Sequence, residues 1–250
     1  IEVTPNWIDP IIELMDADQS IAVCQPKILS FHNKQYFEYA GAAGGFIDKL
    51  GYPFCRGRIF QHLEPDNNQY NDNIQIFWAT GACMFVRADM FHLVNGFDPD
   101  FFAHMEEIDF CWRIKKLGYK IMYSANSTVY HVGGGTLPKI NPRKTYLNFR
   151  NNLTLLLKNL PASSIPKILA IRLVLDIIAA ISFLIKGFHK DALAVLKAYI
   201  SFYSNLTHHL KKRQKNTPRV NHIYNKSIVW QYYIMKNKTF NKLNFFKNSS

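Results

Sequence analysis

The chain has 250 residues, of which 48% are hydrophobic and 14% are aromatic. This composition supports a packed core and excludes an intrinsically disordered chain. The four cysteines are scattered without a Cys-x-x-Cys pair, which argues against a zinc ribbon or a thioredoxin-type site and favours buried thiols in a reducing compartment.

The net charge of +12 is distributed unevenly. Residues 1–150 hold 14 basic and 16 acidic residues, whereas residues 151–250 hold 16 basic and only two acidic residues, Asp176 and Asp191. We therefore expect two regions with different partners. The chain opens without a charged and then apolar leader, so no signal peptide is expected, and it opens in mid-pattern, as if an N-terminal part preceded Ile1.

The first part of the chain alternates short predicted helices and strands. A helix is expected from about residue 9 to Met15, then a strand over 21–29 whose end is weakened by Pro26. A flexible turn over 41–45 follows, with its three glycines. Further along, short strands are expected over 74–79 and 83–86, and a helix over 87–94 that is capped by Asn95-Gly96.

Residues 51–75 are rich in Pro, Asn and Asp and are predicted to form one long loop. Loops of that length in compact domains are usually functional or mobile. Arg56 and Arg58 flank Gly57 within it, and this pair is suited either to phosphate contacts or to a solvated loop.

The segment 96–113, GFDPDFFAHMEEIDFCWR, mixes five acidic residues with five aromatic ones. Carboxylates resist burial and aromatic rings favour it, so this mixture is typical of the wall of a site. After a turn at Gly96 and Pro99, a helix is expected from about Phe102 to Leu117 and ends at Gly118.

Adjacent carboxylates at the start of this helix are candidate acid–base groups. Glu106 and Glu107 lie next to each other near the aromatic side chains, which can raise one pKa toward the range of a general base. Asp109 and Arg113 are four residues apart and can pair. A surface helix with ordinary salt bridges explains the spacing equally well.

Two further short strands are predicted over 119–123 and 127–131. His131 ends the second strand, just before Gly133-Gly134-Gly135-Thr136. The glycine run is suited to a mobile loop that closes over a ligand, with amides that could meet phosphate. Taken alone, a single histidine is more often structural than a ligand.

The character of the chain changes after Tyr146. A helix over 146–160 ends at Pro161, and an apolar run over 168–185 contains Arg172 and Asp176. The run barely reaches the length of a membrane span, and two charges make a full span costly. A helix lying in the membrane interface fits better, and a buried helix of a bundle carries equal weight.

A second amphipathic helix is expected over 191–206, followed by the basic cluster HHLKKRQK at 208–215. A basic cluster beside apolar helices suits an anionic membrane surface. Nucleic acid is the weaker alternative, because no nucleic-acid-binding motif is present. The remainder, 216–250, is basic and aromatic with no clear fold.

Four motifs in order carry a resemblance to a known family. TGACMFVRADMF, GFDPDFF, MEEIDFCWRIKKLGYKI and VYHVGGGT resemble the second half of the catalytic domain of inverting glycosyltransferases of family 2, which have the GT-A fold. The resemblance covers about residues 1–160. It is strongest to the rhamnosyltransferase-like enzymes of bacterial surface polysaccharides.

The resemblance implies roles for particular residues. Glu107 corresponds to the catalytic base, although the family more often has Asp there, so Glu106 stays a rival; Asp109 belongs to the same acidic group. The family's metal-binding Asp-x-Asp would end at Glu2, and His131 matches a downstream histidine, which implies Mg²⁺ or Mn²⁺. Substrate contacts are implied for Trp78, Gly81, Ala82 and Arg113.

The sequence thus predicts an α/β fold: a partial GT-A domain over 1–160, whose nucleotide-binding half would lie upstream, and a helical, basic, membrane-associating region over 161–250. The implied activity is inverting transfer of a sugar from a nucleotide-sugar donor to a saccharide or lipid-linked acceptor at the cytoplasmic face of the membrane, with this fragment inactive by itself. The alternative is a degenerate, non-catalytic domain that binds a membrane or a partner.

Overall fold

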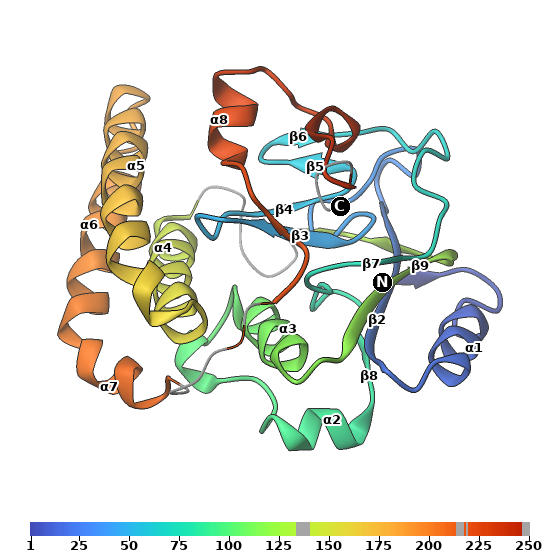
Figure 1. The fold of residues 1–250 in the computed structure, drawn as a ribbon. Helices are drawn as coiled ribbons and strands as arrows, with labels where there is room; N and C mark the ends of the chain where they lie inside the picture. The colour runs from blue at the N-terminus through green and yellow to red at the C-terminus, as the bar shows by residue number, and fades with distance from the viewer. Residues whose placement is uncertain (134–140, 214–217, 219, 247–250) are drawn as a thin grey trace. The chain divides into compact units, whose positions relative to one another are not determined.

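The computed structural model describes residues 1–133, 141–213, 218 and 220–246 (Figure 1). The fold divides into two compact units. Unit 1 comprises residues 1–96, 110–133 and 220–250, and unit 2 comprises residues 97–109 and 134–219. Residues 220–246 belong to unit 1, and the predicted domain boundary at residue 160 stays a prediction.

A mixed sheet forms the first layer of unit 1. Its central strands, β2 (Ile21–Ser30) and β9 (Lys120–His131), run parallel along their whole length. The register of β2 against β9 shifts between Pro26 and Lys27. Pro26 lacks an amide donor, but β2 continues past it and ends at Ser30. The two short strands expected over 119–123 and 127–131 are one strand, β9. The other members are β1 (Glu2–Val3), β7 (Ile74–Gln75) and β8 (Phe85–Val86).

Two helices of unit 1 match the predictions closely. α1 (Asp9–Ala17) has a proline in its first turn and buries Ile11 and Met15 against Ile21 and Cys24 of β2. α2 (Ala88–Leu93) lies within the predicted range of 87–94. The four cysteines are free; Cys24, Cys55 and Cys111 are buried, as predicted, whereas Cys83 is half-buried.

The prediction of one long loop over residues 51–75 is wrong for the first half of this range. Residues 45–63 form antiparallel strands: β3 (Gly45–Asp48), β4 (Pro53–Cys55), β5 (Arg58–Ile59) and β6 (His62–Leu63). Arg56 is 2% exposed, lies over the rings of Tyr70 and Tyr123, and pairs with Asp72 at 2.7 Å. Arg58 is buried as well, so neither arginine belongs to a solvated loop.

The C-terminal segment, for which no clear fold was predicted, completes the second sheet. β10 (Ile223–Tyr224) pairs in parallel with β3. The short helix η3 (Phe240–Leu243) follows α8 (Ile228–Tyr233). It places Phe240 against Phe46 and Phe54, with ring centroids 5.1 and 6.1 Å away. Aromatic burial therefore holds the end of the chain on unit 1.

Unit 2 is helical. The turn η1 (Pro99–Phe101) and the first turn of α3 (Glu106–Lys116) belong to it, and the rest of α3 belongs to unit 1. A bundle follows, made of α4 (Pro142–Asn159), α5 (Ile165–Ile185), α6 (His189–Ser204) and α7 (Leu206–Lys211), with the short turn η2 (Ala162–Ser164) before α5. Leu153, Leu157, Val195, Tyr199 and Phe202 form its core. The α/β class and the helical region are thus confirmed.

One helix in the described part of the chain is long and apolar enough to cross a membrane. It covers Ala162–Ile185, with a mean hydropathy of 2.5 over its best window. Length and composition alone are weak evidence, because core helices of soluble proteins pass the same test.

The packing of Phe240 predicts a specific loss of stability. Phe240 is 4% exposed, whereas its neighbour Phe246 is 49% exposed. Phe240→Ala should lower the free energy of unfolding by about 3–5 kcal/mol, since a buried ring is lost and a cavity remains. Phe246→Ala should lower it by less than about 1 kcal/mol. Urea unfolding checks both, and equal losses would mean that the segment does not pack as described.

Candidate functional site

The segment that leads into α3 has an unusual backbone. Phe102, His104 and Met105 have φ values of 62°, 68° and 73°. Non-glycine residues rarely adopt this left-handed region, and such strain persists only where surrounding contacts hold it. The predicted helix start at Phe102 is therefore too early, and α3 begins at Glu106.

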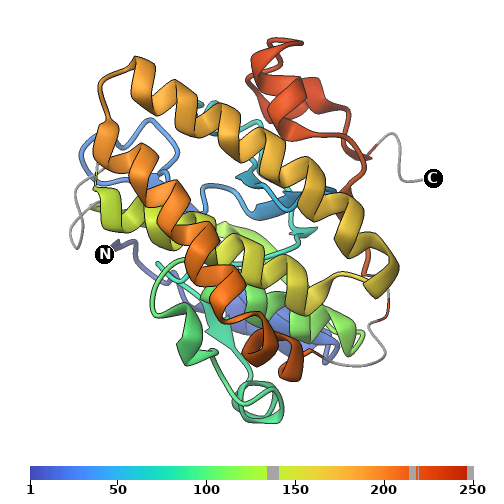
Figure 2. The same ribbon diagram turned by 90° about the vertical axis from the view of Figure 1, so that its left-hand side faces the viewer.

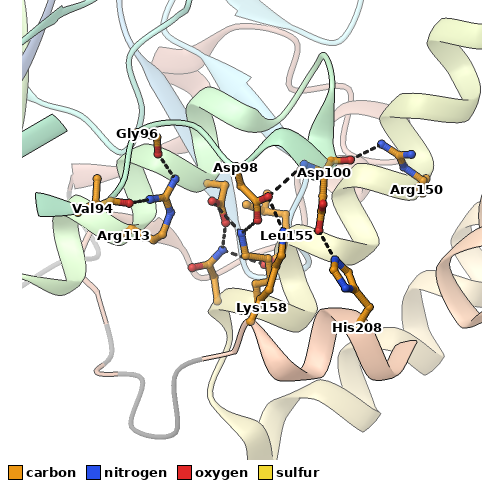
Figure 3. Close-up of polar contacts among 12 residues, drawn as sticks. Val94, Gly96, Asp98, Asp100, Arg113, Arg150, Leu155, Lys158 and His208 are labelled. Carbon is orange, nitrogen blue, oxygen red and sulfur yellow. Dashed lines mark hydrogen bonds and ion pairs between the residues drawn. The ribbon is translucent and has the colours of Figure 1, made fainter. Parts of the chain in front are cut away.

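Two neighbouring residues of α4 hold this strained segment. The buried Asn151 directs its Nδ2 at the carbonyl oxygens of Phe101, Ala103 and His104, at 2.7–2.8 Å. Arg150 donates to the carbonyl of Asp100 at 2.8 Å (Figure 3). These contacts satisfy backbone groups that the irregular segment would leave without partners.

A buried ion-pair group lies beside them. Lys158 Nζ lies 2.6 Å from Oδ2 of Asp98 (Figure 3) and 3.0 Å from Oδ2 of Asp109. Asn159 donates to Asp109 Oδ1 at 2.8 Å. Burial raises the pKa of Asp98, but hydrogen bonds from Lys158 and Lys212 outweigh this and hold the pKa below its usual range. Asp109, predicted as catalytic, is thus fully buried and engaged by α4.

Glu106 and Glu107 have a different environment. One oxygen of each carboxyl group, Oε2, is buried and has no hydrogen-bond partner in the described part of the chain. Burial, and then repulsion from Glu106, raises the pKa of Glu107 to about 8. Burial also raises the pKa of Glu106. Glu107 therefore exchanges a proton near neutral pH, as a general base requires.

His104 lies two residues before this pair and was not predicted as a site residue. Its Nε2 is buried without a described partner, and burial lowers the pKa of the ring. The imidazole is therefore neutral near pH 7 and can accept or donate a hydrogen bond.

The residues predicted to contact substrate lie in unit 1, in two kinds of environment. Trp78 is 4% exposed, and its indole nitrogen donates to the carbonyl of Phe46 at 2.9 Å, so it is a packing residue. Arg113 donates to the carbonyls of Val94 and Gly96 at the end of α2. Gly81 is exposed, and a Cβ there would meet no atom within 4 Å. Ala82 beside it is half-buried, and the substrate role of both residues stays a prediction.

The predicted metal ligands are not brought together. Glu2 pairs with Tyr130 across β1 and β9, and its carboxylate contacts Lys34, which also lies over the Tyr130 ring. Side chains alternate along a strand, so His131 points to the opposite face of the sheet from Tyr130 and Glu2.

His131 has a partner that the sequence did not indicate. Its Nδ1 lies 3.2 Å from the carboxylate of Glu38, which is 7% exposed. This distance suits an ion pair, but the contact lacks the geometry of a hydrogen bond. The role of His131 as a metal ligand stays a prediction, and Glu2 lies apart from it on the other face of the sheet. The glycines and threonine at 134–136 lie outside the described residues.

In unit 2, one further group could hold a cation by spacing alone. Asp100, His208 and His209 have ligand atoms within 4.8 Å of one another. Lys212 already contacts the Asp100 carboxylate, as does His208 at 2.7 Å. The lysine charge opposes a metal ion there, so we interpret this group as an ion-pair network.

Sequence matches to known proteins cover only part of the chain. No family model matches it. Over 59 residues it is 37% identical to the rhamnosyltransferase WbbL of Escherichia coli K12, which covers 24% of this chain and 22% of that protein. Over 71 residues it is 37% identical to the N-acetylglucosaminyl-diphospho-decaprenol L-rhamnosyltransferase of Mycobacterium tuberculosis, covering 28% of this chain and 21% of the relative.

Part of this chain is similar in sequence to rhamnosyltransferases. The matches span about a fifth of the length of these relatives. A crystal structure of GalNAc-T7 with UDP, GalNAc and Mn²⁺ aligns over 86% of this chain and 41% of its own, with a TM-score of 0.45 and 15% identity. That likeness is too low to support an argument about the fold or a ligand.

The raised pKa of Glu107 predicts a pH-dependent stability. The unfolded chain loses this proton near pH 4.5 and the folded chain near pH 8, so stability falls with rising pH between these values, by at most ~1.4 kcal/mol per pH unit. Glu107→Gln removes this dependence. The variant should therefore gain stability relative to the parent, little at pH 5 and most at pH 8, in urea unfolding.

Glu13→Gln, at an exposed position of α1, is the matched control and should change stability equally at both pH values. If Glu107→Gln also had the same effect at pH 5 and pH 8, Glu107 would be an ordinary ionised carboxylate.

Proposed function

We propose that this chain is part of a glycosyltransferase that moves a sugar, with inversion, from a nucleotide-sugar donor to a saccharide acceptor. The observation that carries the proposal is the pair Glu106–Glu107 at the start of α3, with buried carboxyl oxygens that have no described partner and pKa values above the usual range. The relationship of part of the chain to rhamnosyltransferases gives this pair its chemical context. Because the matches span a fifth of those proteins, the activity is proposed for the whole protein.

In the proposed reaction, Glu107 is the general base. Its carboxylate takes the proton of an acceptor hydroxyl while that oxygen forms a bond to the anomeric carbon of the donor sugar. The bond from this carbon to the diphosphate oxygen breaks on the opposite side, and its electron pair leaves with the nucleoside diphosphate. A base with a pKa near the working pH is effective in such proton transfer.

Other residues have supporting roles in this proposal. Asp109, through Lys158 and Asn159, fixes the first turn of α3, and Arg113 fixes the end of α2. Gly81 and Ala82 line the space for substrate, whereas Trp78 supports that segment from the core.

A divalent cation, Mg²⁺ or Mn²⁺, is the expected cofactor. When bound, it would neutralise charge on the leaving diphosphate. His131, whose Nδ1 lies 3.2 Å from the Glu38 carboxylate, is the residue that we assign as a ligand. Glu2 contacts Lys34 and lies on the opposite face of the sheet from His131, so we assign it no role in binding the cation.

A lipid-linked acceptor at the cytoplasmic face of the membrane is the proposed setting, within cell-surface polysaccharide assembly. The name of the mycobacterial relative includes a decaprenol-linked saccharide diphosphate. The apolar helix α5 and the excess of basic residues in 151–250 suit a location beside such a lipid.

A non-catalytic membrane- or partner-binding domain is the second candidate. The observation in its favour is the separation of Glu2 from His131 on opposite faces of the sheet. In that case the acidic pair would no longer serve catalysis, although it would still affect stability.

The test is transfer by the whole protein with Glu107→Gln. The amide cannot accept the proton, so turnover should fall about 10²- to 10⁴-fold. Binding of the nucleotide-sugar donor should be kept, as measured by calorimetry. Nucleoside diphosphate release with a panel of donors and a saccharide acceptor gives the rate.

Glu106→Gln is the matched control and should lose less activity than Glu107→Gln. A larger loss for Glu106→Gln would move the base to that residue. Absence of transfer by the parent protein with every donor and metal would favour the non-catalytic candidate.

A further inference from the structure

The helices α5 and α6 of unit 2 each have two contrasting faces. They pack side by side and are joined through a turn at Gly187, which has a φ of 79° (Figure 2). The inner face of α6 contributes Val195, Tyr199 and Phe202 to the core of the bundle. The outer faces remain exposed to solvent.

The charges of the apolar helix α5 lie on its inner face. Arg172 and Asp176 are 2% and 1% exposed and pair at 3.3 Å. Arg172 also contacts Asn152 of α4, and Tyr199 of α6 donates to Asp176 at 2.8 Å. For α5 to cross a bilayer alone, it would have to leave these partners and carry both charges into hydrocarbon. The packing therefore favours a helix that keeps its place in the bundle.

The outer faces expose large apolar side chains at helical spacing. Eight lie on α5 and four on α6, each at least 37% exposed: Ile171, Leu173, Val174, Ile177, Ile178, Ile181, Leu184 and Ile185, and Leu193, Leu196, Ile200 and Tyr203. We call this set the outer apolar face. Exposed apolar surface of this extent marks an interaction site.

The exposed charges on α5, on α6 and in the turn between them have one sign. Lys167, Lys186, Lys190 and Lys197 are exposed along the two helices. The only carboxylates in residues 151–250, Asp176 and Asp191, are both buried, and Asp191 accepts a hydrogen bond from Thr145 at 2.6 Å. The face is therefore apolar and positively charged. Charge complementarity favours an anionic lipid surface over a second copy of the same face, whose lysines would repel.

We propose that the outer apolar face binds the surface of an anionic bilayer, with α5 and α6 lying in the membrane plane and α5 not spanning it. This deepens the membrane location of the proposed function, but it does not depend on catalysis, because lipid binding needs no donor. Apolar side chains enter the boundary of the acyl chains, while lysines contact headgroup phosphates, as in other in-plane amphipathic helices.

The experiment is sedimentation of the whole protein with vesicles of phosphatidylcholine containing phosphatidylglycerol. Ile178→Glu combined with Ile181→Glu should reduce vesicle binding about tenfold or more, since two charges enter the apolar contact. Both positions are exposed, so folding should be kept, which circular dichroism checks. Leu93→Glu, at a 59% exposed position of α2 in unit 1, is the matched control and should bind like the parent.

Two further measurements separate the alternatives. Parent protein bound to vesicles should be released at alkaline pH and high salt, whereas a spanning helix would stay with the lipid. Analytical ultracentrifugation should give the same oligomeric state for the parent and the double variant. Four outcomes would each overturn the proposal. The parent could resist release from the vesicles, or the double variant could bind as the parent does. The parent could also bind uncharged vesicles equally well, or form a dimer that the double substitution dissociates.

Failure of this proposal and failure of the proposed activity are distinguishable. The double variant in detergent, with a water-soluble acceptor, should transfer sugar at the rate of the parent. Loss of lipid binding with transfer retained supports the proposal. Loss of both with the fold retained would place the outer apolar face in the catalytic machinery and overturn its assignment as a lipid-binding surface.

Discussion

The contact of Lys158 with Asp98 and Asp109 is the interaction on which the candidate site depends. One buried ammonium group joins the residue that opens the turn before α3 to a residue in the first turn of that helix. Burying three charges is costly, and removing one partner would leave an uncompensated charge. Together with the hydrogen bonds from Asn151, this contact holds three residues in the left-handed region. The acidic pair therefore keeps its place, with an Oε2 atom of each carboxyl group that has no hydrogen-bond partner among the described residues.

This arrangement separates two sets of carboxylates that look alike in the sequence. Asp98 and Asp109 are paired with lysine, and the pKa of Asp98 is held low. Glu106 and Glu107, within the same twelve residues, have buried oxygens without described partners, and their pKa values are raised. Environments that push the pKa values of neighbouring acids apart are typical of acid–base sites, and local packing distinguishes the two sets here.

Sequence reasoning succeeded where the signal was local. The pattern of α1, the strand from Ile21 and the helices of unit 2 follow from spacing and capping residues, whereas the catalytic role of the acidic pair stays a prediction. Sequence reasoning failed where the environment of a residue is set by a partner that is distant in sequence. Asn151 and Lys158 read as polar positions of an ordinary helix, and their partners lie about fifty residues away. Arg56 and Arg58 read as loop residues because the tyrosines and carboxylates around them could not be seen.

The most direct test is the titration of the two glutamates by carbon NMR of the side-chain carboxyl groups, assigned with Glu106→Gln and Glu107→Gln. The Glu107 resonance should titrate near pH 8, and removing Glu106 should lower this midpoint because its repulsion is lost. Midpoints near 4.5 for both residues would contradict this prediction, because neither group would then be poised to take a proton at neutral pH.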